Sequence, residues 1–536
     1  MNQILNGIQC ICEETSWMPP HMNSYLTRIN KAEYMPDAAD HEVELFSSET
    51  AVLLVWTFYL LKRPLDAIST RIGRRIQKEV TDRLLAPYLE RDDYWWMGFT
   101  GSRVNNWTPW CNGNVLMALL VFDGDAQVRS KAIRKMMRSL DVFIDTYPED
   151  GCCDEGPMYW GRSGASLYDC LELLHAASGG TIDLFAEKKI RDIGRYLGSV
   201  HIHENYYVNF ADGDAIVHAD PDAVYGYGKA IGDHALTRLG ASIRAKRQGF
   251  VDWFPLYRHI RDLFQEEERL SFGGKPPYVR DAWMHASQVM TAREREGSEQ
   301  GLFLAAKGGH NLESHNHNNV GNFTVYADGL PVFIDLGTEE YVAKTFSPQR
   351  FELWYLQSAY HNVPTIRGVM QRDGSMYRAK DAHYAKNANR SELSMDIAEA
   401  YPGEAGIATW RCSFGLTRGE EAEVTMADEF RLTELAADLY FSFLTPHLPM
   451  ETSEGVFELE YAEGRRVAVA YDGGMFRMRT ERIAITDSRL RGNWGEIVFR
   501  IVLEAKDKLQ QAAHMLRIRI VVDPPKLHSP HFPASP

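Results

Sequence analysis

The densest group of polar side chains in the sequence is GGHNLESHNHNNVGNF, from Gly308 to Phe323. His315 and His317 are two residues apart, and in an extended chain side chains at this spacing project to the same side. This arrangement suits two imidazoles that work in one cleft. The residues that follow, Phe323–Tyr326, predict a core strand that would fix the group in place. The alternative is a polar surface loop without a chemical role.

Helices are expected throughout the first half of the chain. Apolar residues recur there at three- and four-residue spacing, and turn residues separate the segments. The segments are 68–90, 112–122, 128–146, 163–178, 182–199 and 222–240, and Ser47-Ser48-Glu49-Thr50 is expected to open a further helix from Ala51. Repeated helical hairpins without strands predict an (α/α) toroid or a helical bundle.

Beyond Pro277, short segments of alternating apolar and polar residues dominate, and Gly and Asp turns separate them. These segments are 287–292, 302–306, 322–326, 332–335, 422–431, 438–444, 456–461, 466–471 and 517–522. The pattern predicts a mostly antiparallel β-sandwich. We therefore expect two domains, a helical domain over residues 1–277 and a β-sandwich over residues 278–536.

The polar motif resembles that of the heparinase II/III-like polysaccharide lyases. Their hallmark is His-Asn-His-Asn, an acidic residue, Val-Gly-Asn/Ser-Phe, then an Asp at the end of the next strand and a later Tyr-His-Asn. This chain has HNHNNVGNF from His315, then FIDLG with Asp335, then Tyr360-His361-Asn362. Asn319 is a departure, because the family often has Asp there. The resemblance covers most of the chain and implies an N-terminal (α/α) toroid followed by an antiparallel β-sandwich.

The resemblance also implies a metal site. Family members bind a metal through the second His, the strand-end Asp and the later His, which are His317, Asp335 and His361 in this chain. Two imidazoles and a carboxylate suit Zn²⁺, with Mn²⁺ as the alternative, and a water completes the tetrahedron. The metal is expected to be structural. The alternative is that these side chains only bond to one another within the sandwich.

The helical half supplies further residues by the same resemblance. Tyr159 lies in DEGPMYWG, which is similar to the family segment that carries the catalytic tyrosine. In NNWTPW, Asn106 is the first choice and Asn105 the second for binding the substrate carboxylate. Trp107 and Arg162 are expected sugar contacts. Some relatives have a histidine in place of the asparagines, and its absence leaves Tyr159 and His315 as the proton carriers.

The implied reaction is β-elimination on a uronate. Removing the C5 proton builds negative charge on the carboxylate, and an asparagine amide can stabilise this charge without adding its own. A base takes the proton and an acid protonates the leaving oxygen. Tyrosine has an ordinary pKa of about 10, so as a base it needs a nearby positive charge. We expect Tyr159 to serve one uronate epimer and His315 the other.

The expected substrates are glycosaminoglycans such as hyaluronan, chondroitin or heparin-type chains, and alginate is the alternative. Two other classes compete with a lyase. A glycoside hydrolase on an (α/α) toroid would use a carboxylate pair from among Asp154, Glu155, Asp212 and Asp214. A carbohydrate-binding protein would use the aromatic side chains alone. Asp212 and Asp214 can line the cleft or cap the next helix, and the cap is the preferred interpretation.

Net charge, cysteine content and apolar stretches limit the kinds of protein that this chain can be. A formal net charge of −15 argues against general nucleic-acid binding but allows an anionic sugar in a basic cleft. Seven scattered cysteines predict free thiols rather than a disulfide framework. The apolar stretch Ala51–Leu61 is too short to span a bilayer. The N-terminus lacks signal-peptide features, so a cytoplasmic location is expected, or a periplasmic or secreted one if a signal has been removed.

Overall fold

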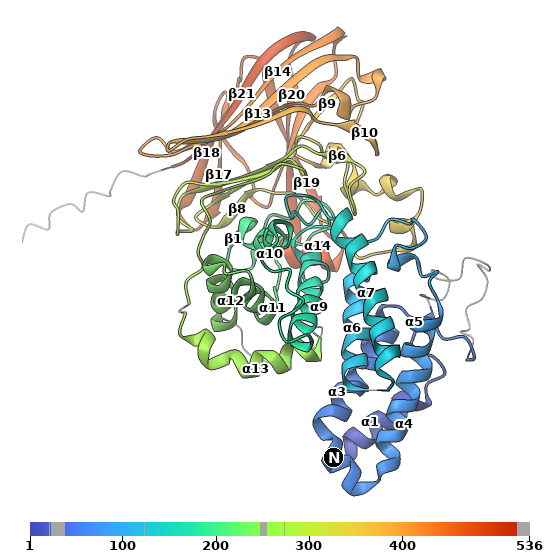
Figure 1. Cartoon of the computed structure of the whole chain (residues 1–536). Coiled ribbons are helices and arrows are strands. Elements are labelled where there is room, and N and C mark those ends of the chain that lie inside the picture. The colour runs from blue at the N-terminus through green and yellow to red at the C-terminus, as the bar shows by residue number, and fades with distance from the viewer. Residues whose placement is uncertain (21, 23–37, 123, 247–254, 273, 522–536) are drawn as a thin grey trace, which may run out of the picture. The chain divides into compact units, whose positions relative to one another are not determined.

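The structure is a computed structural model that describes residues 1–20, 22, 38–122, 124–246, 255–272 and 274–521. Contacts along the chain divide it into two compact units. The helical unit comprises Met1–Gly198 and Val217–Pro277, and the strand-rich unit comprises Ser199–Ile216 and Tyr278–Pro536. Figure 1 shows helices in the first and mainly strands in the second.

The helical unit is built from helices that pack in sequential pairs. Its described helices are α1 (Asn2–Glu13), α3 (Leu45–Ile68), α4 (Thr70–Val80), α5 (Ala86–Glu90), α6 (Trp107–Val121), α7 (Ala126–Thr146), α8 (Pro157–Trp160), α9 (Gly164–Ala177), α10 (Lys188–Ser199), α11 (Pro221–Ala230), α12 (His234–Lys246) and α13 (Leu256–Leu270). Helix α6 contacts α3, α7 and α9, and most of its side chains are buried. Helix α6 is therefore surrounded by other helices of the unit.

Helix α3 begins earlier than Ala51, where the sequence analysis expected it. The Glu44 carboxylate accepts hydrogen bonds from the amides of Phe46 (2.9 Å) and Ser47 (2.6 Å), and the Ser47 hydroxyl accepts from the Glu44 amide (3.0 Å). This capping box satisfies amides that a helix start leaves unpaired. Among the described residues, α3 alone has the length and hydropathy to cross a bilayer, a test that core helices also pass.

The helix expected over residues 222–240 is two helices, α11 and α12. Gly232 lies between them with a φ of 66°, a left-handed conformation that favours glycine. Helix α11 begins at Pro221, and the Asp220 side chain accepts from the Asp222 amide at 3.1 Å. Asp220 is therefore the N-cap of this helix.

The strands of the second unit pair with antiparallel neighbours in three larger sheets and two ribbons. The five-stranded sheet has the order β3 (Asp281–Met284), β4 (Val289–Arg293), β5 (Leu302–Lys307), β7 (Phe323–Ala327), β8 (Leu330–Phe333). The eight-stranded sheet has the order β11 (Lys380–Lys386), β12 (Arg390–Asp396), β13 (Ile407–Thr417), β14 (Glu423–Ala436), β21 (Leu509–Ile520), β18 (Arg465–Ala470), β17 (Val456–Ala462), β16 (Met450–Ser453).

The third larger sheet has four strands, and the one α-helix among the described residues of this unit follows its strand β19. Its order is β19 (Phe476–Ala484), β20 (Ile497–Ala505), β15 (Leu439–Thr445), β9 (Pro364–Ile366), and the helix is α14 (Ser488–Trp494). The ribbons are β1 (His201–His203) with β2 (Tyr206–Tyr207), and β6 (His310–Asn311) with β10 (Gly374–Arg378).

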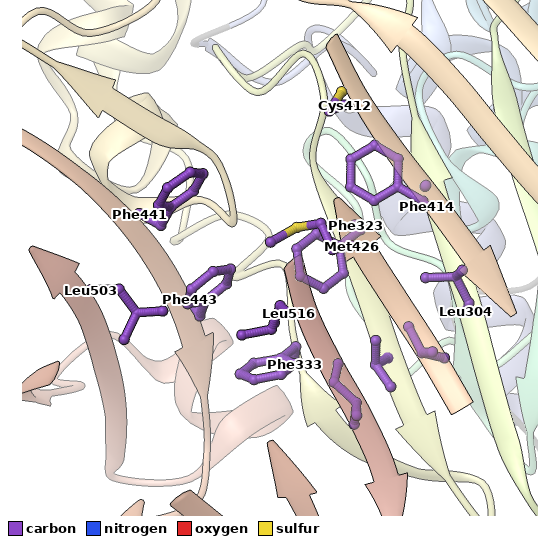
Figure 2. Close-up of a cluster of buried hydrophobic side chains, with 14 of the residues drawn as sticks. Leu304, Phe323, Phe333, Cys412, Phe414, Met426, Phe441, Phe443, Leu503 and Leu516 are labelled. Atoms are coloured by element: carbon purple, nitrogen blue, oxygen red, sulfur yellow. The ribbon is translucent and has the colours of Figure 1, made fainter. Parts of the chain in front are cut away.

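Buried apolar side chains from all three larger sheets form one core, which Figure 2 shows. The Phe323 ring centroid lies 5.6 Å from that of Phe414 and 6.1 Å from those of Phe333 and Phe443. Phe323 ends the polar motif, so the core anchors the end of the motif loop. The expected fold class, a helical region followed by antiparallel sheets, is confirmed.

The segment Ser199–Ile216 departs from the expected domain limits, because it packs with the strand-rich unit. The Arg293 guanidinium of β4 donates to the carbonyls of His201 and Ile202, each at 2.9 Å. The Thr291 hydroxyl donates to the Ser199 carbonyl at 2.9 Å. These bonds attach the β1–β2 ribbon to the five-stranded sheet. Asp212 lies in the same segment and therefore also belongs to the strand-rich unit.

Candidate active site

One carboxylate, that of Asp212, lies at the centre of the polar groups around the histidine motif. Its Oδ2 lies 2.8 Å from His315 Nδ1, and its Oδ1 lies 3.0 Å from His317 Nε2. Oδ1 also accepts from Arg350 Nη2 at 2.7 Å, and the Tyr341 hydroxyl lies 3.3 Å from Oδ2. Both histidines of the motif therefore converge on one acceptor.

Asp212 is fully buried. Burial raises the pKa of its carboxyl, but the hydrogen bonds from His315 and His317 and the charge of Arg350 outweigh burial and hold the pKa well below its usual range. The carboxylate is therefore ionised at neutral pH, and its charge is balanced within the cluster.

His315 is held by its backbone as well as its ring. Its φ is 54°, a left-handed conformation that is uncommon for residues with a Cβ and that clusters at functional sites. The Asp212 amide donates to the His315 carbonyl at 3.2 Å. The His315 side chain is 18% exposed, whereas that of His317 is completely buried. Of the two imidazoles, only that of His315 is partly exposed to solvent.

The helix-cap interpretation of Asp212 and Asp214 is wrong. Asp220 caps α11, which begins only at Pro221. The Asp214 carboxylate accepts from Arg489 at 2.9 Å and from Asn493 at 3.0 Å. Sequence reasoning offered Asp212 as a cleft residue but missed its bonds to both histidines, because these partners follow more than 100 positions later in the chain.

Three buried side chains, His317, Asp335 and His361, form a candidate metal cluster. Each offers a ligand atom, and these atoms all lie within 4.8 Å of one another. His317 lies in the loop before β7, Asp335 follows β8, and His361 follows the 3₁₀ turn Ser358–Tyr360. The expected grouping of these three residues is confirmed.

The chemistry of the cluster fits a metal ion. Within the described part of the chain, His317 Nδ1 and both ring nitrogens of His361 are buried without hydrogen-bond partners. Such groups are costly unless something satisfies them. The Asp335 carboxylate lies 3.3 Å from His361 Nδ1 and accepts from the amides of Asn319 (3.1 Å) and Asn322 (2.6 Å). Amide donors of this kind orient a ligating carboxylate.

Asn319, the departure from the family motif, has a clear place in this cluster. It is fully buried, and its amide donates to the Asp335 carboxylate. Burial raises the pKa of Asp335, but the neighbouring His361 and His317 outweigh burial and lower it. A neutral donor at position 319 suits an ionised neighbour, whereas a second carboxylate there would repel Asp335.

In the helical unit, Tyr159 lies in the short helix α8. Gly156 precedes this helix with a φ of 92°, and Pro157 occupies its first position. The next residue, Trp160, is buried, and its indole nitrogen donates to the Ile193 carbonyl at 2.7 Å. Trp160 thus anchors α8, and Tyr159 itself is half-buried.

Asn106 lies immediately before α6, and its partner was not expected. Its Nδ2 donates to Glu155 Oε2 at 2.7 Å, and both side chains are buried. An amide nitrogen carries two hydrogens, so this bond uses one of them and fixes the orientation of the amide. Glu155, which the sequence suggested only as a hydrolase carboxylate, is thus a partner of Asn106.

The other expected substrate contacts of the helical unit differ in exposure. Asn105 Oδ1 accepts from the Trp107 amide at 3.0 Å. The Trp107 side chain is buried and its ring centroid lies 5.1 Å from that of Trp95, so this indole packs within the protein. Arg162 lies 3.2 Å from Glu49 and 4.0 Å from the centroid of the Trp110 ring, with its side chain 26% exposed.

Comparisons with known proteins agree with this architecture. Residues 282–507 match the family model described as Heparinase II/III-like, C-terminal. A heparinase III crystal structure is similar with a TM-score of 0.63 and 12% identity over 94% of this chain and 72% of that one. A heparan sulfate lyase HepC mutant from Pedobacter heparinus has a TM-score of 0.60, at 12% identity and the same coverages.

The fold extends to a chondroitin AC lyase from Streptomyces coelicolor A3 in complex with chondroitin sulphate. Its TM-score is 0.53, with 10% identity over 90% of this chain and 67% of that one. No curated protein sequence matches the chain. At these identities the structures define the fold alone, a helical region followed by antiparallel sheets. The residues that match the family model all lie in the strand-rich unit.

Proposed function

We propose that the protein is a polysaccharide lyase that cleaves uronic-acid-containing polysaccharides by β-elimination. The observation that carries the proposal is the partly exposed imidazole of His315, which buried Asp212 holds and which lies within the residues that match the Heparinase II/III-like C-terminal model. The similar structures, which include a heparan sulfate lyase and a chondroitin AC lyase, support this reaction class.

In the proposed reaction, a base removes the proton at C5 of the uronate. The electrons of the C5–H bond form the C4=C5 double bond, and the C4–O bond breaks with its electrons on oxygen. An acid protonates this oxygen, which leaves as the new end of the other fragment. Asn106 donates to the substrate carboxylate, where the charge develops. Tyr159 and His315 exchange the protons, each as base for one uronate epimer.

Glycosaminoglycans such as hyaluronan, chondroitin or heparin-type chains are the proposed substrates, and alginate is the alternative. In the helical unit, Arg162 supplies a partly exposed cation that suits an anionic sugar. A hydrolase is less well supported, because the candidate carboxylates are engaged elsewhere. Asp154 pairs with Arg103, Glu155 binds Asn106, and Asp212 binds the histidines.

We also propose that His317, Asp335 and His361 bind Zn²⁺, with Mn²⁺ as the alternative. Two imidazoles and one carboxylate are a common zinc ligand set. Bound there, the ion would brace the loop that carries His315 against β8 and the Ser358–Tyr360 turn. It has no part in the proton transfers.

Ultraviolet absorbance tests the reaction class directly. A lyase product contains a C4=C5 double bond conjugated to the carboxylate and absorbs in the near ultraviolet, whereas a hydrolase product has only a new reducing end. A panel of heparin-type chains, chondroitin, hyaluronan and alginate should include at least one polymer that yields this absorbance. New reducing ends without absorbance would identify a hydrolase, and neither signal on any uronate polymer would refute the proposal.

Tyr159→Phe tests the proton carriers, because it removes one oxygen and keeps the ring. We expect a folded protein whose rate of double-bond formation falls by about a hundred- to ten-thousandfold. His315→Ala should be comparably impaired on at least one uronate epimer. The matched control is Tyr59→Phe, on an exposed tyrosine of α3, which should retain the wild-type rate. Wild-type rates for Tyr159→Phe on every active polymer would exclude Tyr159 as a proton carrier.

A further inference from the structure

The position of Asp212 between two imidazoles has a consequence for both rings. The Arg350 guanidinium donates to the Asp212 carboxylate at 2.7 Å, and a carboxylate paired with an arginine accepts hydrogen bonds and cannot donate them. Each ring nitrogen that faces it must therefore carry a hydrogen, which places one on His315 Nδ1 and one on His317 Nε2. In a neutral imidazole the opposite nitrogen then holds the lone pair. For His315 this is Nε2, and for His317 it is Nδ1.

The two lone pairs serve different chemistry. His317 Nδ1 is buried, has no hydrogen-bond partner within the described residues, and belongs to the ring that joins Asp335 and His361 in the candidate metal cluster. A ligating histidine needs just such a lone pair, with its other nitrogen donating to a carboxylate. His315 lies outside that cluster, and its side chain is partly exposed, so Nε2 is the nitrogen that the proposed function requires as the base.

The remaining partners hold the carboxylate itself. Arg350 donates to the same oxygen that faces His317, and it also donates to the Asn316 carbonyl at 3.3 Å, within the motif. The Tyr341 hydroxyl lies near the oxygen that faces His315, and its ring centroid lies 6.2 Å from that of His315. Both Asp212 oxygens are therefore fixed, and the carboxylate cannot turn from one imidazole without losing the other.

We infer that Asp212 is a positioning residue that sets the tautomers of His315 and His317 together. One carboxylate thereby makes the proton carrier and the candidate metal ligand parts of a single hydrogen-bonded unit. Only the role of His315 as a base rests on the proposed function. The tautomer of His317 rests on the geometry of Asp212 and of the metal cluster.

The first test measures the tautomers in the wild-type protein, and variants serve only to assign the signals. Nitrogen-15 NMR of histidine-labelled protein, assigned with His315→Ala and His317→Ala, reports which ring nitrogen carries the hydrogen. We expect hydrogen on Nδ1 of His315 and on Nε2 of His317. The opposite tautomer at His317 would overturn the inference, whether or not the protein proves to be a lyase.

Asp212→Asn is the second test, because it keeps the shape of the side chain. An amide has one acceptor oxygen and one NH₂ donor, so it can accept from only one imidazole. We expect at least one ring to change tautomer and zinc affinity, measured with zinc alone against a chelator, to fall by about ten- to a hundredfold. With an active polymer, kcat should fall while KM changes little.

Asp328→Asn is the matched control, on a partly buried aspartate of the same unit with the same loss of charge. The Asp328 carboxylate accepts from the Gly301 amide and the Tyr461 hydroxyl, each at 2.8 Å. This variant should keep the tautomers, the zinc affinity and the kcat of the wild type. The inference is refuted if Asp212→Asn leaves tautomers and zinc affinity unchanged, or if Asp328→Asn alters them equally.

Discussion

At the residue scale, the bond between Asn106 and Glu155 gives the amide a fixed orientation before any substrate arrives. A donor that is already oriented stabilises charge without a cost of reorganisation at the moment of reaction. Asn106→Ala should therefore reduce kcat by about a hundredfold or more, and KM should change little, because the bond strengthens as charge develops. Steady-state kinetics on the active polymer measures both constants.

Asn105→Ala provides the comparison for this prediction. Asn105 accepts a hydrogen bond from the Trp107 amide and is expected to contact ground-state substrate, so its loss should raise KM more than it lowers kcat. If Asn106→Ala raises only KM, Asn106 is a binding residue and another donor stabilises the developing charge.

Single residues of the site were predictable from sequence where a local motif carries them. His317 and Asp335 lie in one loop-and-strand segment, and His361 follows in a motif of its own, so their grouping could be predicted. Asp212 could not, because its partners are distant in sequence and a Gly-Asp turn is also typical of a helix cap. Residue type alone likewise does not distinguish Trp107, which is buried, from an indole open to sugar.

At the scale of elements, β14 and β21 place two titratable groups inside the sandwich. Asp428 of β14 lies opposite His514 of β21 in the strand register, and both side chains are buried. The Trp410 indole donates to Asp428 at 2.7 Å, but burial outweighs this bond and raises the pKa of Asp428 to about 7. Burial likewise lowers the pKa of His514 to about 4.

These shifts give opposite dependences of stability on pH. Folded Asp428 binds its proton more tightly than the unfolded chain does, so its contribution is present at low pH and is lost as pH rises from about 4 through 7. Folded His514 resists protonation, so its contribution is present above about pH 6.5 and is lost as pH falls towards 4. Asp428→Asn removes only the first dependence.

The Tm of Asp428→Asn relative to wild type should therefore increase steadily between pH 4 and pH 8. Thermal unfolding at several pH values measures this difference, and Asp507→Asn, on an exposed aspartate, is the control that should show no such trend. A difference that is constant over this range would mean that Asp428 does not titrate in the folded protein as its burial implies.

Two elements, α13 and β11, were not predicted from the sequence, because their residues lack the expected apolar periodicity. Helix α13 has an inverted pattern, with Arg258, Arg261 and Arg269 buried and Leu263 and Phe264 exposed. Its buried arginines pair with buried aspartates, so apolar periodicity does not mark its inner face. Strand β11 is almost wholly exposed at the edge of its sheet and lacks alternation.

At the scale of the whole molecule, each of the two units is built from two separate segments of the chain. The chain leaves the helical unit after Gly198, contributes Ser199–Ile216 to the strand-rich unit, and returns at Val217. A change in sequence character near Pro277 predicts a boundary there, but it cannot reveal this earlier excursion. This excursion brings Asp212 to the motif histidines.

The candidate metal should accordingly stabilise one unit selectively. His317, Asp335 and His361 come from three segments of the strand-rich unit, so an ion bound to all three stabilises the folded state of that unit by mass action. Removing the metal with a chelator should increase amide hydrogen exchange in β7, β8 and residues 354–366. Exchange in α3, α6 and α9 should change little.

Mass spectrometry of the exchanged protein locates these changes along the chain, and elemental analysis should find close to one zinc or manganese per chain before chelation. In the absence of chelator, His317→Ala should increase exchange in the same segments. The variant lacks one metal ligand, and two buried nitrogens of His361 remain unsatisfied. His285→Ala, on an exposed histidine of the same unit, is the matched control and should exchange like the wild type. If chelation leaves exchange in both units unchanged, or if the purified protein contains no transition metal, the three residues form a metal-free cluster held by hydrogen bonds to Asp212, Asn319, Asn322 and Gly337 and by their own contacts.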